Sequence, residues 1–81
     1  MSTLIDRTKS ATYENGFVTI LMDSGLEYRF PVSRNPRLRD GSAEQLANIV
    51  ITPFGVHWPD LDEDLSLRGI QVGEYGQEKG T

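Results

Sequence analysis

The dipeptide Asn15-Gly16 constrains the fold of this chain more than any other feature. A two-residue hairpin turn needs a positive φ angle at both central positions, and asparagine and glycine adopt it readily. Apolar and polar residues alternate on both sides of the dipeptide, as in strands with one buried face. The sequence therefore predicts a hairpin in which Tyr13 pairs with Val18 and Ala11 with Ile20.

A second turn is expected at Asp23-Ser24-Gly25, where two strand registers compete. A two-residue loop would pair Leu21 with Tyr28 and set apolar residues opposite charged ones. A three-residue loop, with Gly25 in the left-handed conformation, instead collects the apolar side chains on one face. Because register follows the face that can be buried, the three-residue loop is predicted. That face holds Tyr13, Val18, Ile20, Met22, Leu26, Tyr28 and Phe30.

Capping signals predict two short helices after this meander. Asn35-Pro36 supplies an N-cap and a favoured first helical residue, and Gly41 limits that helix to about one turn. Ser42-Ala43-Glu44-Gln45 matches a capping box, which predicts a helix over residues 43–48.

Only short elements are predicted for the rest of the chain. Residues 49–51 and 56–58 are expected to be extended, and residues 60–64 form a charged loop. Residues 65–72 are compatible with a strand or a helix; a helix capped by Asp64 is the prediction. The expected class is α+β, with an N-terminal antiparallel three-stranded meander followed by short helices and a short strand.

Length and composition narrow the class of protein. A chain of 81 residues supports one domain, expected over residues 9–73 between a flexible N-terminus (1–8) and a disordered tail (74–81). The absence of cysteine excludes disulfide frameworks and thiol catalysis, and it fits the cytoplasm as the expected location. No apolar stretch predicts a membrane span or a signal peptide. A net charge of −4 argues against nucleic acid as a direct partner.

The string from His57 to Asp64 is the most conspicuous candidate site. It holds one imidazole and the four carboxylates of Asp60, Asp62, Glu63 and Asp64, so a metal- or small-ligand-binding site is one interpretation. A calcium loop is excluded, because Leu65 stands where glycine is required and Gln71 where glutamate is required. An acidic surface loop is the interpretation we favour, with no metal and no cofactor.

Two residues of this string have their own alternatives. His57 is the only histidine, and a structural role is favoured over general-base catalysis because no serine lies in a nucleophile motif. Trp58 is either a core anchor or a contact residue in an interface.

Three arginines, Arg34, Arg37 and Arg39, lie within six positions. A planar guanidinium suits carboxylate or phosphate, so the cluster could contact an acidic partner or a phosphate backbone. The alternative is that Arg37 or Arg39 pairs with the acidic loop while the other side chains are solvated.

Two segments resemble a bacterial family. They are Pro31-Val32-Ser33-Arg34-Asn35-Pro36-Arg37-Leu38 and Gly55-Val56-His57-Trp58-Pro59-Asp60-Leu61-Asp62-Glu63-Asp64-Leu65-Ser66. Together they are similar to the bacterial domain of unknown function family 2442, and the match departs at Ile70-Gln71, where that family often has two leucines. Some members are encoded beside small proteins in arrangements similar to toxin–antitoxin pairs. The resemblance implies a small α+β partner-binding module and transfers no catalytic residue.

The expected function is therefore a small protein-interaction module, antitoxin-like and not an enzyme. Its candidate contact residues are His57, Trp58, Asp60, Asp62, Glu63, Asp64, Arg34, Arg37 and Arg39. The first alternative is a metal- or ligand-binding protein or enzyme centred on His57 and the acidic loop. The second is a nucleic-acid-associated regulator that uses the three arginines. A second copy of the chain is an alternative partner, because the meander has an exposed edge.

Overall fold

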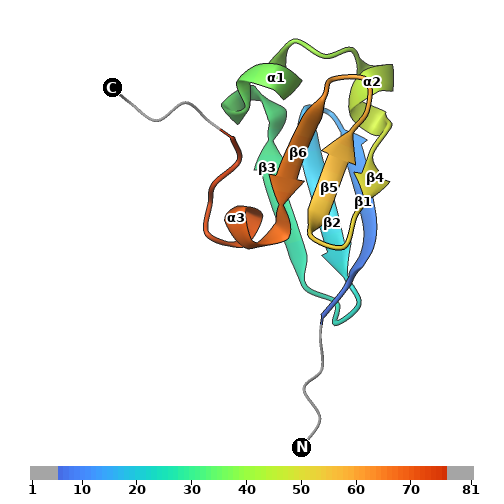
Figure 1. The fold of residues 1–81 in the computed structure, drawn as a ribbon, viewed down its shortest axis with the longest axis vertical. Coiled ribbons are helices and arrows are strands. Elements are labelled where there is room, and N and C mark those ends of the chain that lie inside the picture. Colours follow the sequence, from blue (N-terminus) through green and yellow to red (C-terminus); the bar gives the residue numbers. More distant parts are fainter. Residues whose placement is uncertain (1–5, 77–81) are drawn as a thin grey trace, which may run out of the picture.

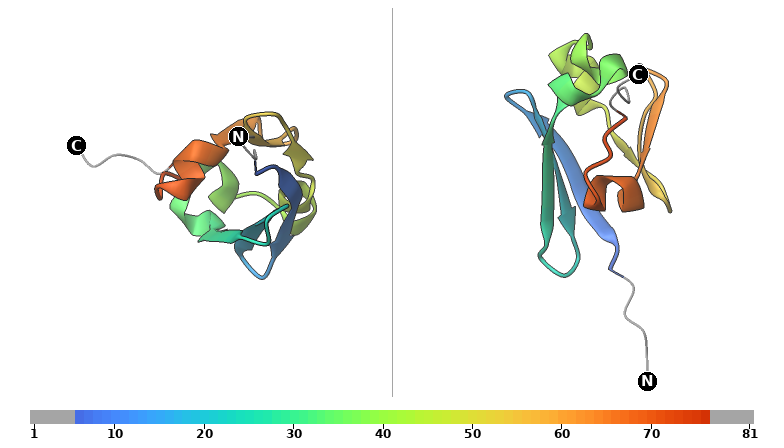
Figure 2. Two further views of the ribbon diagram at one scale, coloured as in Figure 1. Left: turned by 90° about the horizontal axis from the view of Figure 1, so that it is seen from below. Right: turned by 90° about the vertical axis from the view of Figure 1, so that its left-hand side faces the viewer.

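Two antiparallel three-stranded sheets face each other in the computed structural model, which describes residues 6–76 (Figure 1). The right-hand view of Figure 2 shows the two layers, with short helices across one end. The first sheet consists of β1 (Thr8–Glu14), β2 (Phe17–Met22) and β3 (Glu27–Pro31), and the second of β4 (Val50–Ile51), β5 (Gly55–Trp58) and β6 (Glu63–Ser66). The predicted α+β class is confirmed, and the structure adds the second sheet.

Both predicted turns of the meander are confirmed. Asn15 and Gly16 have φ angles of 50° and 87°, and β1 pairs with β2 in the predicted register, Tyr13 opposite Val18. Gly25 has a φ of 96°, and Ile20 lies opposite Tyr28. The three-residue loop therefore forms, because it turns the apolar side chains of both strands toward the second sheet.

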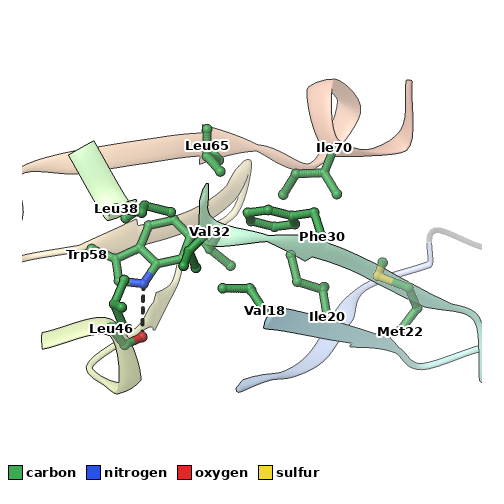
Figure 3. Close-up of a cluster of buried hydrophobic side chains, with 11 residues drawn as sticks. Val18, Ile20, Met22, Phe30, Val32, Leu38, Leu46, Trp58, Leu65 and Ile70 are labelled. Atoms are coloured by element: carbon green, nitrogen blue, oxygen red, sulfur yellow. Dashed lines mark hydrogen bonds between the residues drawn. The ribbon is translucent and has the colours of Figure 1, made fainter. Parts of the chain in front are cut away.

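The core fills the space between the sheets (Figure 3). Four of the residues predicted for the inner face, Val18, Ile20, Met22 and Phe30, are buried. Leu26 is 57% exposed, because it lies at the end of the turn beyond the reach of the second sheet. The other buried apolar residues are Val32, Leu38, Leu46, Val56, Trp58, Leu65 and Ile70.

The helices are short, and side chains cap their first turns. The 3₁₀ helix η1 (Val32–Arg34) leads into α1 (Pro36–Arg39), which Asn35 caps as predicted. The predicted capping box forms at Ser42 and Gln45 and starts α2 (Ala43–Ala47). Within residues 6–76, no helix has the length and apolar character needed to cross a membrane.

The region after Trp58 differs from the prediction. Glu63 and Asp64 belong to β6 and not to a loop, and the strand continues through Leu65 and Ser66. Pairing with β5 explains the difference, because it buries Leu65 opposite Val56. The helix predicted over residues 65–72 is shorter, α3 (Leu67–Gln71), and its cap is Ser66, not Asp64.

The two predicted flexible ends lie partly outside the described residues, which omit 1–5 and 77–81. The described parts of both ends contact the domain. The carboxylate of Asp6 accepts a hydrogen bond from the backbone N–H of Ser24 at 2.9 Å. The ring of Tyr75 stacks on Phe30 with centroids 4.7 Å apart. The C-terminal segment therefore covers one side of the core.

Phe30→Ala is expected to lower the free energy of unfolding by about 3–5 kcal/mol, because it empties a fully buried site. Phe17 of β2 is the matched control; it is 37% exposed and its ring lies 4.4 Å from the guanidinium carbon of Arg29. Phe17→Ala is expected to remove about 1 kcal/mol or less. Urea unfolding measures both values, and equal losses would contradict this assignment of the core.

Candidate functional site

The fold brings the arginine cluster and the acidic segment to the same end of the molecule. Arginines of η1 and α1 lie beside the turn that joins β5 to β6 (Figure 1). The Arg37 guanidinium lies 3.5 Å from the backbone oxygen of Asp62 and 3.9 Å from the Glu63 carboxylate. We call the exposed side chains of this region the charged end: Arg34, Arg37, Arg39, Asp60, Asp62 and Asp64.

Asn35 connects the two charged elements. Its side chain is fully buried, and its Oδ1 accepts hydrogen bonds from the backbone N–H groups of Arg37 and Leu38 at 2.8 and 3.1 Å. Its Nδ2 donates to Glu63 Oε2 and to the backbone oxygen of Tyr75, both at 2.7 Å. One amide thus caps α1 and binds both β6 and the C-terminal segment. The sequence predicted the cap but not the other two contacts.

Glu63 differs from the carboxylates around it. The sequence placed it among the contact residues, yet its side chain is only 16% exposed and points inward to Asn35. Its Oε1 also accepts the backbone N–H of Asp64 at 3.2 Å. Glu63 therefore holds the hairpin in place rather than facing a partner.

Trp58 is a core residue. Its side chain is 0% exposed, and its Nε1–H donates to the backbone oxygen of Leu46 at 3.1 Å (Figure 3). Of the two interpretations of this residue, the structure supports the core anchor. The prediction that Trp58 is a contact residue is wrong, because a fully buried ring cannot touch a partner.

His57 and Asp64 form a cross-strand pair on the outer face of the second sheet. They lie opposite each other in β5 and β6, and His57 Nδ1 is 2.7 Å from Asp64 Oδ1. The side chains are 31% and 76% exposed. Within residues 6–76, Asp64 is the only hydrogen-bonded partner of this ring, while the hydroxyls of Ser42 and Ser66 cap helices.

The acidic side chains do not converge on a point where a cation could bind. Asp60 accepts a hydrogen bond from Asn48 Nδ2 at 3.0 Å, Glu63 points inward and Asp64 binds His57. In the described part of the chain, no three histidine or carboxylate side chains are arranged to hold a metal ion. The geometry therefore lends no support to the metal-binding alternative.

The three arginines have different surroundings. The Arg34 guanidinium lies 5.8 Å from the centre of the Tyr75 ring. Arg37 pairs with Glu63, as one interpretation of the sequence proposed, but the pair is long and Arg37 is 61% exposed. Arg39 is exposed and forms no ion pair with residues 6–76. Exposed ion pairs of this kind contribute little to stability, so these charges remain available to a partner.

Sequence reasoning missed a second feature, at the opposite end of the molecule. Phe54, in the turn between β4 and β5, is 82% exposed, and Val50 and Ile51 of β4 are 44% and 43% exposed. The sequence does contain a signal for this exposed side chain. An aromatic residue stands between Pro53 and Gly55, in a turn, where side chains are rarely buried.

Comparison with known proteins identifies relatives over nearly the whole chain. The model of a family described as protein of unknown function (DUF2442) matches residues 8–76. A crystal structure of a protein of unknown function from Rhodospirillum rubrum is 30% identical, with a TM-score of 0.81 over 93% of this chain and 95% of that one. A solution structure of the uncharacterized protein CV0863 from Chromobacterium violaceum is 28% identical, with a TM-score of 0.76 over 88% of this chain and 69% of that one. No curated protein matches.

Asn35→Ala is expected to lower the free energy of unfolding by about 2–4 kcal/mol, because it removes a helix cap and the hydrogen bonds that the buried amide donates to β6 and to the C-terminal segment. Asn48→Ala is the matched control. It removes one exposed hydrogen bond to Asp60 and should change stability by about 0.5 kcal/mol or less. Chemical unfolding measures both variants, and a similarly small loss for Asn35→Ala would contradict its connecting role.

Proposed function

We propose that this chain, which belongs to the DUF2442 family, is a protein-interaction module and not an enzyme, and that it binds its partner through the charged end. The observation that carries the proposal is the exposure of six charged side chains of both signs on a framework fixed by buried contacts. Complementary charges direct encounter and orientation in protein complexes.

Basic groups on the partner would complement the carboxylates of the charged end. Asp60 and Asp62 form no ion pair with residues 6–76, and the chain as a whole carries a net charge of −4. The three arginines lie beside these carboxylates, so the partner would also present acidic groups to them. A phosphate backbone fits less well, since Asp60 and Asp62 would repel it.

A binding role is also more consistent with the surroundings of His57 than catalysis is. A general base acts on a nucleophile within hydrogen-bond reach, and within residues 6–76 the His57 ring is hydrogen-bonded to the Asp64 carboxylate and to no hydroxyl group. The family resemblance adds a candidate for the partner: a small protein encoded beside this one, with this chain in the antitoxin-like role.

Co-expression of this chain with the product of the adjacent gene tests the proposal. We expect the two proteins to copurify, and Asp62→Ala/Asp64→Ala to weaken the affinity by about tenfold or more, because it removes two exposed charges from the contact. Biolayer interferometry at low and high salt measures the affinity, which should fall as salt screens the charges.

The matched control is Asp23→Ala/Glu27→Ala, which removes the same charge from exposed positions near the β2–β3 turn, at the opposite end of the molecule (Figure 1). This variant should bind like the wild type. Equal weakening by both double variants would show that the effect comes from the net charge of the chain and not from contacts at the charged end. Unchanged binding by folded Asp62→Ala/Asp64→Ala would show that the charged end is not the contact.

A further inference from the structure

The edge of β3 that faces away from β2 is open. β3 pairs with β2 alone, and no backbone hydrogen bond joins it to another part of residues 6–76. The right-hand view of Figure 2 looks onto this edge, and no helix or strand crosses in front of β3. An open strand edge presents unpaired N–H and C=O groups to which a further strand can bind.

The other sheet edges of the described chain are less accessible. β1 carries a bulge between Thr8 and Ser10 and lies beside β4, so the edges of these two strands face each other. On β6, the backbone N–H of Asp64 is bonded to Glu63 Oε1 at 3.2 Å. Among these edges, that of β3 is therefore the one suited to pair with another chain.

Strand alternation identifies the backbone groups at the open edge. The N–H of Met22 donates to the backbone oxygen of Leu26 at 2.8 Å, and the pairing of β2 with β3 beyond this bond has no bulge. Every second residue from Leu26 onward therefore bonds to β2. Glu27 and Arg29 lie between those residues, so their N–H and C=O groups point to the open edge.

The side chains of β3 are complementary to those of a second, antiparallel copy. With Tyr28 on the two-fold axis, Glu27 faces Arg29 of the second copy, and Arg29 faces its Glu27. Both side chains are exposed, and neither forms an ion pair within the described part of the chain. The Phe17 ring lies 4.4 Å from one face of the Arg29 guanidinium, whose N–H groups can still bind a carboxylate. Opposite charges directly across a strand pair stabilise it.

The same register fits the backbone and the ends of the strand. The outward N–H and C=O groups of Glu27 meet those of Arg29 of the second copy, as in a hydrogen-bonded antiparallel pair. Leu26, which is 57% exposed, comes to lie opposite Phe30 of the second copy and gains apolar cover. Pro31 ends β3 and has no N–H to donate, so the ladder cannot extend beyond it.

We infer that two copies of this chain associate through the open edge of β3, in an antiparallel pair centred on Tyr28, and join their meanders into one continuous sheet. The two-fold symmetry closes the assembly at a dimer. The charged end lies beyond the other end of β3, so it stays exposed in both copies (Figure 1). The dimer therefore goes beyond the proposed function and does not depend on it.

Analytical ultracentrifugation of the full chain, at concentrations up to about 1 mM, tests this inference. The wild type should form a concentration-dependent dimer. Arg29→Glu and Glu27→Arg should each weaken the dimer about tenfold or more, because each sets like charges opposite each other. An equimolar mixture of these two variants should form a heterodimer, since one chain then presents positive charges to the negative charges of the other. Circular dichroism verifies that the variants fold.

The variant Glu27→Arg/Arg29→Glu exchanges the two charges and should restore the dimer, although the contact of Arg29 with Phe17 stays lost. Arg39→Glu is the matched control, because it makes the same change of charge at an exposed position of the charged end, and it should leave the dimer unchanged. The inference is overturned if the wild type stays monomeric, if the dimer survives both single reversals, or if neither the exchange nor the mixture restores association.

The dimer and the charged end can be tested separately. Asp23→Ala/Glu27→Ala should weaken the dimer and leave the affinity of each chain for the partner unchanged, because it removes a charge from the β3 edge and none from the charged end. Asp62→Ala/Asp64→Ala should do the reverse. Loss of partner binding would thus leave the dimer intact, and a monomeric chain would leave the proposed function intact.

Discussion

The buried side-chain amide of Asn35 is the contact on which the arrangement of the charged end depends. Its two N–H groups and its oxygen together make four hydrogen bonds, which is the full capacity of an asparagine side chain. These bonds join α1, β6 and the C-terminal segment, which are far apart in the sequence. Since a buried polar group without a partner is destabilising by about 1–3 kcal/mol, each of these elements fixes the position of the others.

The close packing around this amide explains features of its neighbours. A Cβ atom at Gly76 would come within 2.5 Å of Asn35 Nδ2, and Gly76 has a φ of 78°, so a side chain there would disrupt both the contact and the backbone conformation. Tyr75 can then stack on Phe30 while its backbone oxygen accepts from Asn35. The polar network and the apolar core thus support each other.

Local rules predicted the parts of the fold that depend on neighbouring residues. The turns at Asn15-Gly16 and Gly25 set the strand register, and Asn35 and Ser42 start the helices. Long-range pairing decided the rest. The composition of the acidic string predicts a loop, but pairing with β5 makes a strand of residues 63–66. Strand alternation then turns Glu63 inward and leaves Asp64 exposed, a difference that composition alone does not contain.

The candidate site, like the fold, could be predicted from the sequence only in part. Composition located the two charged clusters, but their proximity follows from the hydrogen bond between Asn35 and Glu63. Trp58 illustrates the converse, since it stands two residues before the exposed Asp60 while its own ring lies buried between the sheets. Phe54 was missed because a turn is expected to be polar, and only the three-dimensional structure shows that its side chain is 82% exposed.

A double-mutant cycle between Asn35→Ala and Glu63→Ala tests this account most directly. The two residues are 28 positions apart and share a hydrogen bond of 2.7 Å between a buried amide and a carboxylate. If this bond joins the two charged elements, the free energies of unfolding of the wild type, both single variants and the double variant should give a coupling energy of about 1–3 kcal/mol. Additivity within about 0.5 kcal/mol would show that α1 and β6 are held together by other contacts and would contradict the account.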